Sequence, residues 1–166
     1  MIDKADFYDI NAFGPAGSIN SSVKEMANWV MTWINDGKFD GKEILPASFR
    51  QEAISSQMIM RGGAPSKDKP ELYFGTYGFG WMMSSYYGHY RVEHGGNIDG
   101  FSASTCFFPS DSVGIVVLCN QDGSSVPSIV RNLLADRMLG LKYYDWQSDL
   151  YNPYAEGLKT AKSAEK

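Results

Sequence analysis

The sequence is poor in several features that mark particular classes of protein. It has two cysteines among 166 residues, too few for a disulfide framework. Lysine and arginine number 15 against 19 acidic residues and are scattered along the chain, so nucleic acid is not an expected partner. No apolar run approaches the roughly 20 residues that a membrane span needs, and residues 1–10 lack the basic and apolar regions of a signal peptide. These absences favour one globular domain and leave the cellular compartment open.

The two cysteines flank a predicted hairpin turn at residues 109–112. In a hairpin centred there, Cys106 lies opposite Ile115 and Cys119 lies opposite Ser102. Several residues of strand, at roughly 3.4 Å each, then separate the two sulfur atoms, which is too far for a disulfide bond. We therefore expect two free thiols.

An amphipathic helix is predicted over residues 23–34. A capping box marks its start, because Glu25 follows Ser22 by three residues, and Asp36-Gly37 supplies a stop. The apolar residues that recur at helical spacing are Val23, Met26, Ala27, Val30 and Ile34. A second, shorter helix is predicted from Pro46, because proline is tolerated in a first turn. Residues 61–75 are rich in glycine, proline and charge and predict an exposed, mobile loop.

Four β-type runs follow between residues 77 and 119, separated by short turn signals. The turns at Tyr87-Gly88 and residues 109–112 predict hairpins, and the almost wholly apolar last run predicts a strand covered on both faces. A closing amphipathic helix is expected to turn four residues toward the sheet: Ile129, Leu133, Leu134 and Met138. The predicted fold class is α+β, an antiparallel β-sheet with N-terminal helices and a C-terminal helix packed on it.

One of the two histidines stands beside two glycines inside a predicted strand, in the stretch "RVEHGGNIDGFSAST". Glycine weakens a strand interior, so the pair indicates a bulge or a close approach to the backbone. A hydrogen-bonding side chain followed by small residues can hold a substrate carbonyl along a sheet edge, and a backbone N–H just beyond can form half of an oxyanion hole. The alternative is a histidine at a bulge, bonded to a neighbouring strand. The tripeptide alone does not decide between them.

The other candidate residues carry weaker signals. His89, at a hairpin turn, is expected to be exposed to solvent, and two histidines this close in strands give no metal signature. Asp99-Gly100 predicts a turn. The aromatic residues near the first run are expected in the core or in cross-strand pairs, with one or two lining a substrate cleft: Tyr77, Phe79, Trp81, Tyr86 and Tyr87.

Longer stretches in the sequence resemble the C-terminal part of the serine β-lactamase-like family, which includes class C β-lactamases, D-alanyl-D-alanine peptidases and related esterases. They cover residues 12–141 in the family's order and read "GPAGSINSSVKEMANWV", "HGGNIDGFSAST", "FFPSDSVGIVVLCNQDG" and "IVRNLLADRML". The resemblance implies that His94, Gly95 and Gly96 fill the third-motif positions, where the family has Lys-Thr-Gly or His-x-Gly. It also implies that Asn97 offers a backbone N–H to the oxyanion hole. Residues 1–150 would then be the C-terminal portion of a β-lactamase/transpeptidase-like domain, and residues 151–166 a tail or linker.

The sequence departs from this family where the nucleophile should stand. The family places a Ser-x-x-Lys helix and a Tyr-x-Asn loop well before the Pro-Ala-Gly segment, yet only eleven residues precede Ala12 here. The stretch from Ser21 to Lys24 matches Ser-x-x-Lys, and Ser18-Ile19-Asn20 imitates the second motif, but their order is reversed and they are adjacent. Ser21 also stands at a predicted helix start, where capping explains a serine. We therefore expect a chain that lacks the nucleophile and does not turn over alone.

Two kinds of function fit these observations. In the first, the chain is part of a serine hydrolase that attacks a small peptide, β-lactam or ester through an acyl-serine intermediate, without cofactor or metal. Its N-terminal half would come from the same gene or from a second chain, and histidine at position 94 favours peptidase-like or esterase-like relatives over a penicillinase. In the second, it is a non-catalytic binding or assembly module whose exposed half-interface promotes a homodimer. Bacterial relatives imply a periplasmic or extracellular location, and the abrupt start and charged end favour a portion of a longer gene product.

Overall fold

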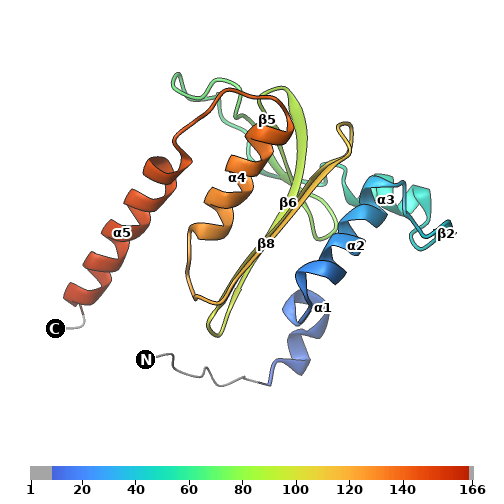
Figure 1. Ribbon diagram of the computed structural model, residues 1–166, viewed down its shortest axis with the longest axis horizontal. Coiled ribbons are helices and arrows are strands. Elements are labelled where there is room, and N and C mark those ends of the chain that lie inside the picture. Colours follow the sequence, from blue (N-terminus) through green and yellow to red (C-terminus); the bar gives the residue numbers. More distant parts are fainter. Residues whose placement is uncertain (1–8, 165–166) are drawn as a thin grey trace.

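Six strands form one antiparallel sheet in the computed structural model, which describes residues 9–164 (Figure 1). Neighbouring strands follow one another in the chain, so the sheet is a simple meander. Its strands are β3 (Met58–Arg61), β4 (Gly75–Tyr77), β5 (Met82–Tyr86), β6 (His89–Ile98), β7 (Phe101–Phe108) and β8 (Val113–Cys119). The predicted α+β class with an antiparallel sheet is confirmed.

The first predicted β run differs from the structure in its extent. It was expected to continue from Tyr77 into the following strand, but β4 ends at Tyr77 and β5 begins only at Met82. The break occurs at Gly78, where a side chain would lie 2.2 Å from the carbonyl oxygen of Ala53. The Gly78 N–H instead bonds the carbonyl of Trp81 at 2.8 Å, which closes a tight turn. The short strands β3 and β4 were not predicted as separate elements.

Helices cover the sheet on both faces, with α2 and α4 on opposite sides of β8 (Figure 1). The N-terminal side carries η1 (Asn11–Phe13), α1 (Gly14–Gly17), α2 (Val23–Ile34) and α3 (Ala47–Ala53), with a small hairpin of β1 (Lys38–Phe39) and β2 (Lys42–Glu43). The other side carries α4 (Val126–Met138) and α5 (Trp146–Ala164). The strand at 113–119 has a helix on each face, as predicted, but the cover is incomplete, because Leu118 is 43% exposed. No helix in the described part of the chain is long and apolar enough to cross a membrane.

Helix α2 starts and ends as predicted. The Ser22 hydroxyl accepts the Glu25 backbone N–H at 3.3 Å, and the Glu25 carboxylate accepts the Ser22 N–H at 3.2 Å, which completes the capping box. Val30 and Trp33 are buried against the sheet, but Val23 and Ala27 are exposed, contrary to the predicted apolar face. Val23 is the first helical residue, and the sheet begins to cover the helix only about two turns later.

Helix α4 turns a partly polar face toward the sheet. Ile129 is buried and Leu133 packs against the core as predicted, but Leu134 and Met138 are exposed. The buried positions belong instead to Asn132, Ala135 and Asp136. Asp136 accepts hydrogen bonds from the Tyr86 hydroxyl at 2.5 Å and from the Trp146 indole N–H at 2.7 Å, so a polar anchor decides which face is buried.

Helix α5 occupies most of the segment expected to be a tail or linker. Its first residue, Trp146, is buried and stacks on Tyr86 with ring centroids 6.1 Å apart. Asp149 pairs with Lys69 from the β3–β4 loop at 2.5 Å. The start of α5 is thus held to the sheet side of the molecule, while the division at residue 150 stays a prediction.

The cysteine register agrees with the sequence analysis. Cys106 pairs with Ile115 and Cys119 with Ser102 across the β7–β8 hairpin, and both thiols are free. Burial raises the pKa of Cys106 to about 12, so this thiol is an inert part of the core.

Candidate functional site

The site begins where strand β6 loses one of its two neighbours. Pairing with β5 ends at Glu93, opposite Met82, whereas pairing with β7 continues to Ile98, opposite Phe101. The last five residues of β6, His94 to Ile98, therefore form an open edge toward the β5 side. The register with β7 is continuous through Gly95 and Gly96, so the alternative of a bulge at these glycines is wrong.

The hairpin turns on either side of β6 decide which backbone groups face this open edge. Both turns contain two residues at positive φ: Tyr87 and Gly88 at 50° and 90°, and Asp99 and Gly100 at 39° and 88°. The residues that flank such a turn exchange hydrogen bonds with each other. The backbone of His89 therefore points to β5, and that of Ile98 points to β7.

Backbone groups of a strand point alternately to its two sides. Counting from either turn, Gly95 and Asn97 direct their N–H and carbonyl groups away from β7 and toward the open edge. The side chain of His94 agrees with this assignment, because its Nδ1 lies 2.6 Å from the Gly95 carbonyl oxygen. The backbone N–H of Asn97, the predicted oxyanion donor, therefore lies on the exposed edge of the sheet.

The His94 ring is held at both nitrogen atoms. A carbonyl oxygen only accepts, so Nδ1 carries the proton that bonds Gly95. Nε2 lies 3.1 Å from the Tyr77 hydroxyl and, in the tautomer that carries its proton on Nδ1, accepts a hydrogen bond from it. The two rings meet edge to face at 6.0 Å, and both side chains are half-buried. His94 is thus a fixed, partly accessible group at the start of the open edge.

Tyr77 was not identified as a partner of His94 from the sequence. It stands on β4, seventeen residues earlier, and no motif or spacing connects the two. The contact arises because β5 starts late, which leaves the end of β4 to face His94.

The two glycines of the motif leave space at this edge. A Cβ on Gly95 would lie 3.5 Å from the Ala103 carbonyl oxygen, and one on Gly96 would lie 3.8 Å from the Ala103 side chain. Both are ordinary contact distances, so the packing of the described residues does not require glycine here. Gly114 is a contrast, since its Cβ would lie 2.4 Å from Val30 under helix α2. The small size of Gly95 and Gly96 keeps the edge open.

The side chain of Asn97 has a structural task of its own. Its Nδ2 donates to Asp122 at 2.6 Å, while its Oδ1 accepts from the Ser102 hydroxyl at 2.6 Å and from the Gly123 N–H at 2.7 Å. The side chain thereby fixes the loop between β8 and α4. Of the polar groups of Asn97, the backbone N–H and carbonyl are therefore the ones available to a ligand at the open edge.

A wide groove adjoins the open edge, between the N-terminal segment 9–21 and the ends of β6, β7 and β8. Its volume is about 1420 Å³. Five large apolar side chains that line it are between 41% and 80% exposed: Phe13, Ile19, Ile98, Phe101 and Leu118. A groove this apolar resembles an uncovered interface more than an ordinary surface.

Ser21 lines the same groove, but its surroundings agree with a role at the start of the helix. Its hydroxyl donates to the Glu25 carboxylate at 3.1 Å, beside the capping box. The backbone N–H of Ser22, with the hydroxyls of Ser22 and Ser21, lowers the pKa of Glu25. A carboxylate with a lowered pKa is a weak base, so this contact does not activate Ser21 as a nucleophile.

His89, the other histidine, lies at the opposite end of β6. It was expected to be exposed, but it is half-buried and its Nδ1 contacts the Asp111 carboxylate at 2.9 Å. Asp111 stands in the β7–β8 turn, so this pair joins two hairpin ends. His89 takes no part in the open edge.

Comparison with known proteins agrees with this architecture. The chain matches a family model described as Beta-lactamase over residues 2–137. It is similar in structure to an octameric penicillin-binding protein homologue from Pyrococcus abyssi, with a TM-score of 0.61 and 19% identity over 78% of this chain and 26% of that one. A penicillin-binding protein from Bacillus halodurans also matches, with a TM-score of 0.46 and 18% identity over 68% of this chain and 30% of that one. No curated protein matches the sequence.

The chain therefore spans between about a quarter and a third of the length of the solved structures that it resembles. The family model covers most of the chain, including α2, the whole sheet and nearly all of α4. The six-stranded antiparallel sheet with helices on both faces is the fold that the Pyrococcus homologue shares. This chain belongs to the Beta-lactamase family.

Proposed function

We propose that this chain supplies the sheet-side wall of a serine hydrolase that cleaves amide or ester bonds through an acyl-serine intermediate. The observation that carries the proposal is the open edge of β6, with Gly95 and Asn97 facing outward and His94 fixed at its start. A substrate carbonyl that lies along this edge meets backbone N–H groups. The two glycines remove the side chains that would block its approach.

The chemistry that this edge supports is stabilisation of charge. When a serine attacks the substrate carbonyl, negative charge develops on the carbonyl oxygen, and a fixed backbone N–H stabilises it without rearrangement. We assign this donor to Asn97. The pairing of Asn97 with Ser102 on β7 holds this backbone in place before substrate binds, while the Asn97 side chain fixes the neighbouring 121–124 loop.

His94 has a supporting role in this proposal. Its Nδ1 proton is engaged by Gly95, so Nε2 and the Tyr77 hydroxyl are the groups that can exchange a proton or bond the substrate. Histidine at the position where relatives carry either lysine or histidine favours peptidase-like or esterase-like substrates over β-lactams, as the resemblance implies.

The nucleophile in this proposal lies outside the chain, in an N-terminal half that covers the apolar groove. The exposed side chains around Ile98 and Phe101 support such a partner, which comes from the same gene product or from a second chain. The same groove also supports the alternative of a non-catalytic assembly module, in which a second copy of the chain covers these side chains.

Intact-mass spectrometry after treatment with a fluorophosphonate probe tests the proposal. We expect the 166-residue chain alone to remain unlabelled. The whole protein, meaning this chain together with the N-terminal half proposed above, should take up the probe on a serine outside this chain. His94→Ala should slow labelling of the whole protein, while His89→Ala, at the far end of the same strand, should leave it unchanged. An adduct on Ser21, or equal labelling rates for both histidine variants, would overturn the assignment.

A further inference from the structure

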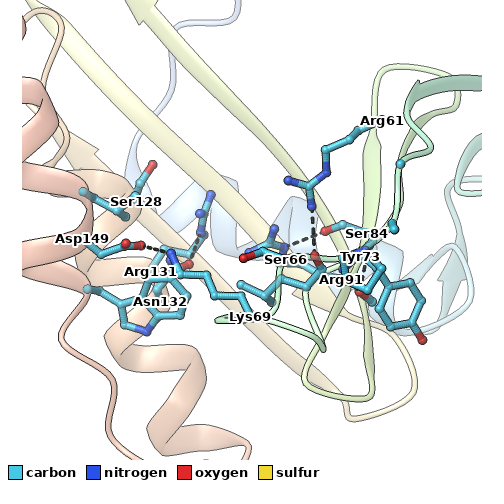
Figure 2. A pocket seen from close by; sticks show the side chains of 17 residues that line it. Arg61, Ser66, Lys69, Tyr73, Ser84, Arg91, Ser128, Arg131, Asn132 and Asp149 are labelled. Atoms are coloured by element: carbon cyan, nitrogen blue, oxygen red, sulfur yellow. Dashed lines mark hydrogen bonds and ion pairs between the residues drawn. The ribbon is translucent and has the colours of Figure 1, made fainter.

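A second pocket lies on the α4 side of the sheet, away from the open edge of β6. It has a volume of about 540 Å³ and lies between the β3–β4 loop, strands β5 and β6, and helices α4 and α5 (Figure 2). Side chains alternate along β6, so Arg91 points into this pocket while His94 points to the opposite face. The volume is in the range of small-molecule sites.

The charged side chains that line the pocket are mainly positive. Four cationic side chains from four different segments line it: Arg61, Lys69, Arg91 and Arg131. Among the residues that the structure describes, Asp149 is the one carboxylate that lines it. Glu93 lies between Arg91 and Arg131 and pairs with both, and the buried Asp136 accepts a hydrogen bond from Tyr86, whose ring lies under Arg91. Even with these two carboxylates included, the cations are in excess, and a concave surface concentrates their potential.

The guanidinium groups also retain hydrogen-bond donors. Arg91 donates Nε to the Ser84 hydroxyl at 3.1 Å and Nη2 to Glu93 at 3.0 Å. Arg131 donates Nε to Asn132 at 3.1 Å and uses Nη1 for Ser104 and Glu93. A guanidinium has five N–H donors, so within the described part of the chain each arginine keeps at least two that are not used by these partners.

Arg91 and Arg131 are also well ordered for recognition. Their side chains are only 15% and 12% exposed, and Glu93 holds them side by side. Arg91 lies over the Tyr86 ring, with 5.0 Å between its central carbon and the ring centroid. A guanidinium group held in place in this way can donate two parallel N–H bonds to two oxygen atoms of a phosphate or a carboxylate.

One wall of the pocket comes from outside the family match. Trp146, Asp149 and Leu150 belong to α5, whereas the Beta-lactamase match ends at residue 137. Burial opposes the charge of Lys69, but Asp149 and Tyr144 outweigh it and raise the pKa of Lys69. The Lys69–Asp149 pair thus connects the β3–β4 loop to α5 across the pocket (Figure 2).

We propose that this pocket binds a small molecule through an oxyanion, either a phosphate or a carboxylate, held by Arg91, Arg131, Arg61 and Lys69. The ligand's oxyanion lies on the pocket side of Glu93, against the guanidinium N–H groups of Arg91 and Arg131 that Glu93 does not use, and shares Lys69 with Asp149. Its remaining atoms lie against Tyr73 and Trp146.

Titration calorimetry on the 166-residue chain tests this, with inorganic pyrophosphate as one probe and citrate as the other. We expect one of them to bind with a dissociation constant below about 1 mM at physiological salt. Binding of pyrophosphate alone identifies a phosphate ligand, and binding of citrate alone identifies a carboxylate ligand. If neither probe saturates the chain by about 10 mM, the proposal is wrong.

Three variants make the test specific. Arg61 is exposed and makes one bond to the Leu72 carbonyl, so Arg61→Gln should fold and should weaken binding about tenfold. Lys42→Gln removes the same charge from an exposed position on β2 and should change nothing. Asp149→Asn removes the competing carboxylate and should tighten binding several-fold. Equal weakening by Arg61→Gln and Lys42→Gln, or no gain from Asp149→Asn, would contradict the proposed site.

Discussion

The two halves of strand β6, each five residues long, differ in strand pairing and in burial. The first half, His89 to Glu93, lies between β5 and β7, and its residue Val92 is fully buried. The second half, His94 to Ile98, is paired on one side only, and four of its residues are exposed. One continuous strand thus passes from the core into the candidate site.

The comparison shows how a site is held in place. The buried half sets the direction and register of the strand. The exposed half continues in the same direction and register, with no bulge or loop between the two halves. The groups assigned to function are therefore backbone groups on a rigid element, which positions them more exactly than a flexible loop does. Substitutions should accordingly affect stability in the first half and activity in the second.

The largest expected effect is on the buried half. Phe107, the cross-strand partner of Val92, is fully buried, and Phe107→Ala should lower the free energy of unfolding by about 3–5 kcal/mol. Phe101 stands on the same strand opposite Ile98 and is 46% exposed, so Phe101→Ala should cost less than about 1 kcal/mol. Urea unfolding of both variants measures the difference. Similar losses for the two would remove the distinction between the halves.

The next effect is on activity at the open half. Asn97→Pro removes the backbone N–H and should slow acylation of the whole protein by about 100- to 1000-fold. Asn97→Ala removes the side-chain bonds to Asp122 and Gly123 but keeps the N–H, so its acylation rate should stay within a few-fold of the parent. Pre-steady-state acylation by an ester substrate measures both. If Asn97→Ala slowed acylation as much as Asn97→Pro, the side chain and not the backbone would be responsible.

A change of pH should also act on the core around the buried half, through its cross-strand neighbours on β5 and β7. Burial, followed by the hydrogen bond to Asp136, raises the pKa of Tyr86 far above its usual value, and burial raises that of Cys106 to about 12. The unfolded chain therefore loses these protons first as pH rises, so the stability they give is complete below about pH 9 and falls above it. We expect a loss of about 1–3 kcal/mol by pH 11. Urea unfolding at pH 8 and pH 11 measures it, and Tyr86→Phe should reduce the pH dependence.

The smallest effect on stability should come from the glycines of the site. Gly96→Ala fits the space available and should change the free energy of unfolding by less than about 1 kcal/mol. Gly114→Ala, beneath Val30, should instead destabilise by about 1–3 kcal/mol. Thermal unfolding compares them. A large loss in Gly96→Ala would mean that the glycine serves packing and not access to the edge.

Features set by near neighbours in the chain were predictable. The capping box of Ser22 and Glu25 needs three residues of separation, and the two-residue turn at Tyr87-Gly88 is signalled by Gly88, which adopts its φ of 90° without strain. The register that places Cys106 opposite Ile115 follows from the position of one turn. The α+β class and the resemblance of the His94 segment to its family rest on such local patterns.

Predictions failed where distant residues compete for the same space. Leu134 and Met138 fit the spacing of an apolar helix face but are exposed. Asp136 is buried instead, because it accepts hydrogen bonds from Tyr86 and Trp146. Strands β3 and β4 are too short to carry a periodic pattern, and the break at Gly78 depends on the carbonyl of Ala53.

The sequence by itself determined the start of α2, the hairpin turns and the order of the main strands, because each depends on bonds between residues a few positions apart. Only the tertiary structure decided that β6 outruns β5, that Tyr77 meets His94, and that four cations share one pocket. These juxtapositions depend on the lengths and packing of elements that lie far apart in the chain. No local pattern records them.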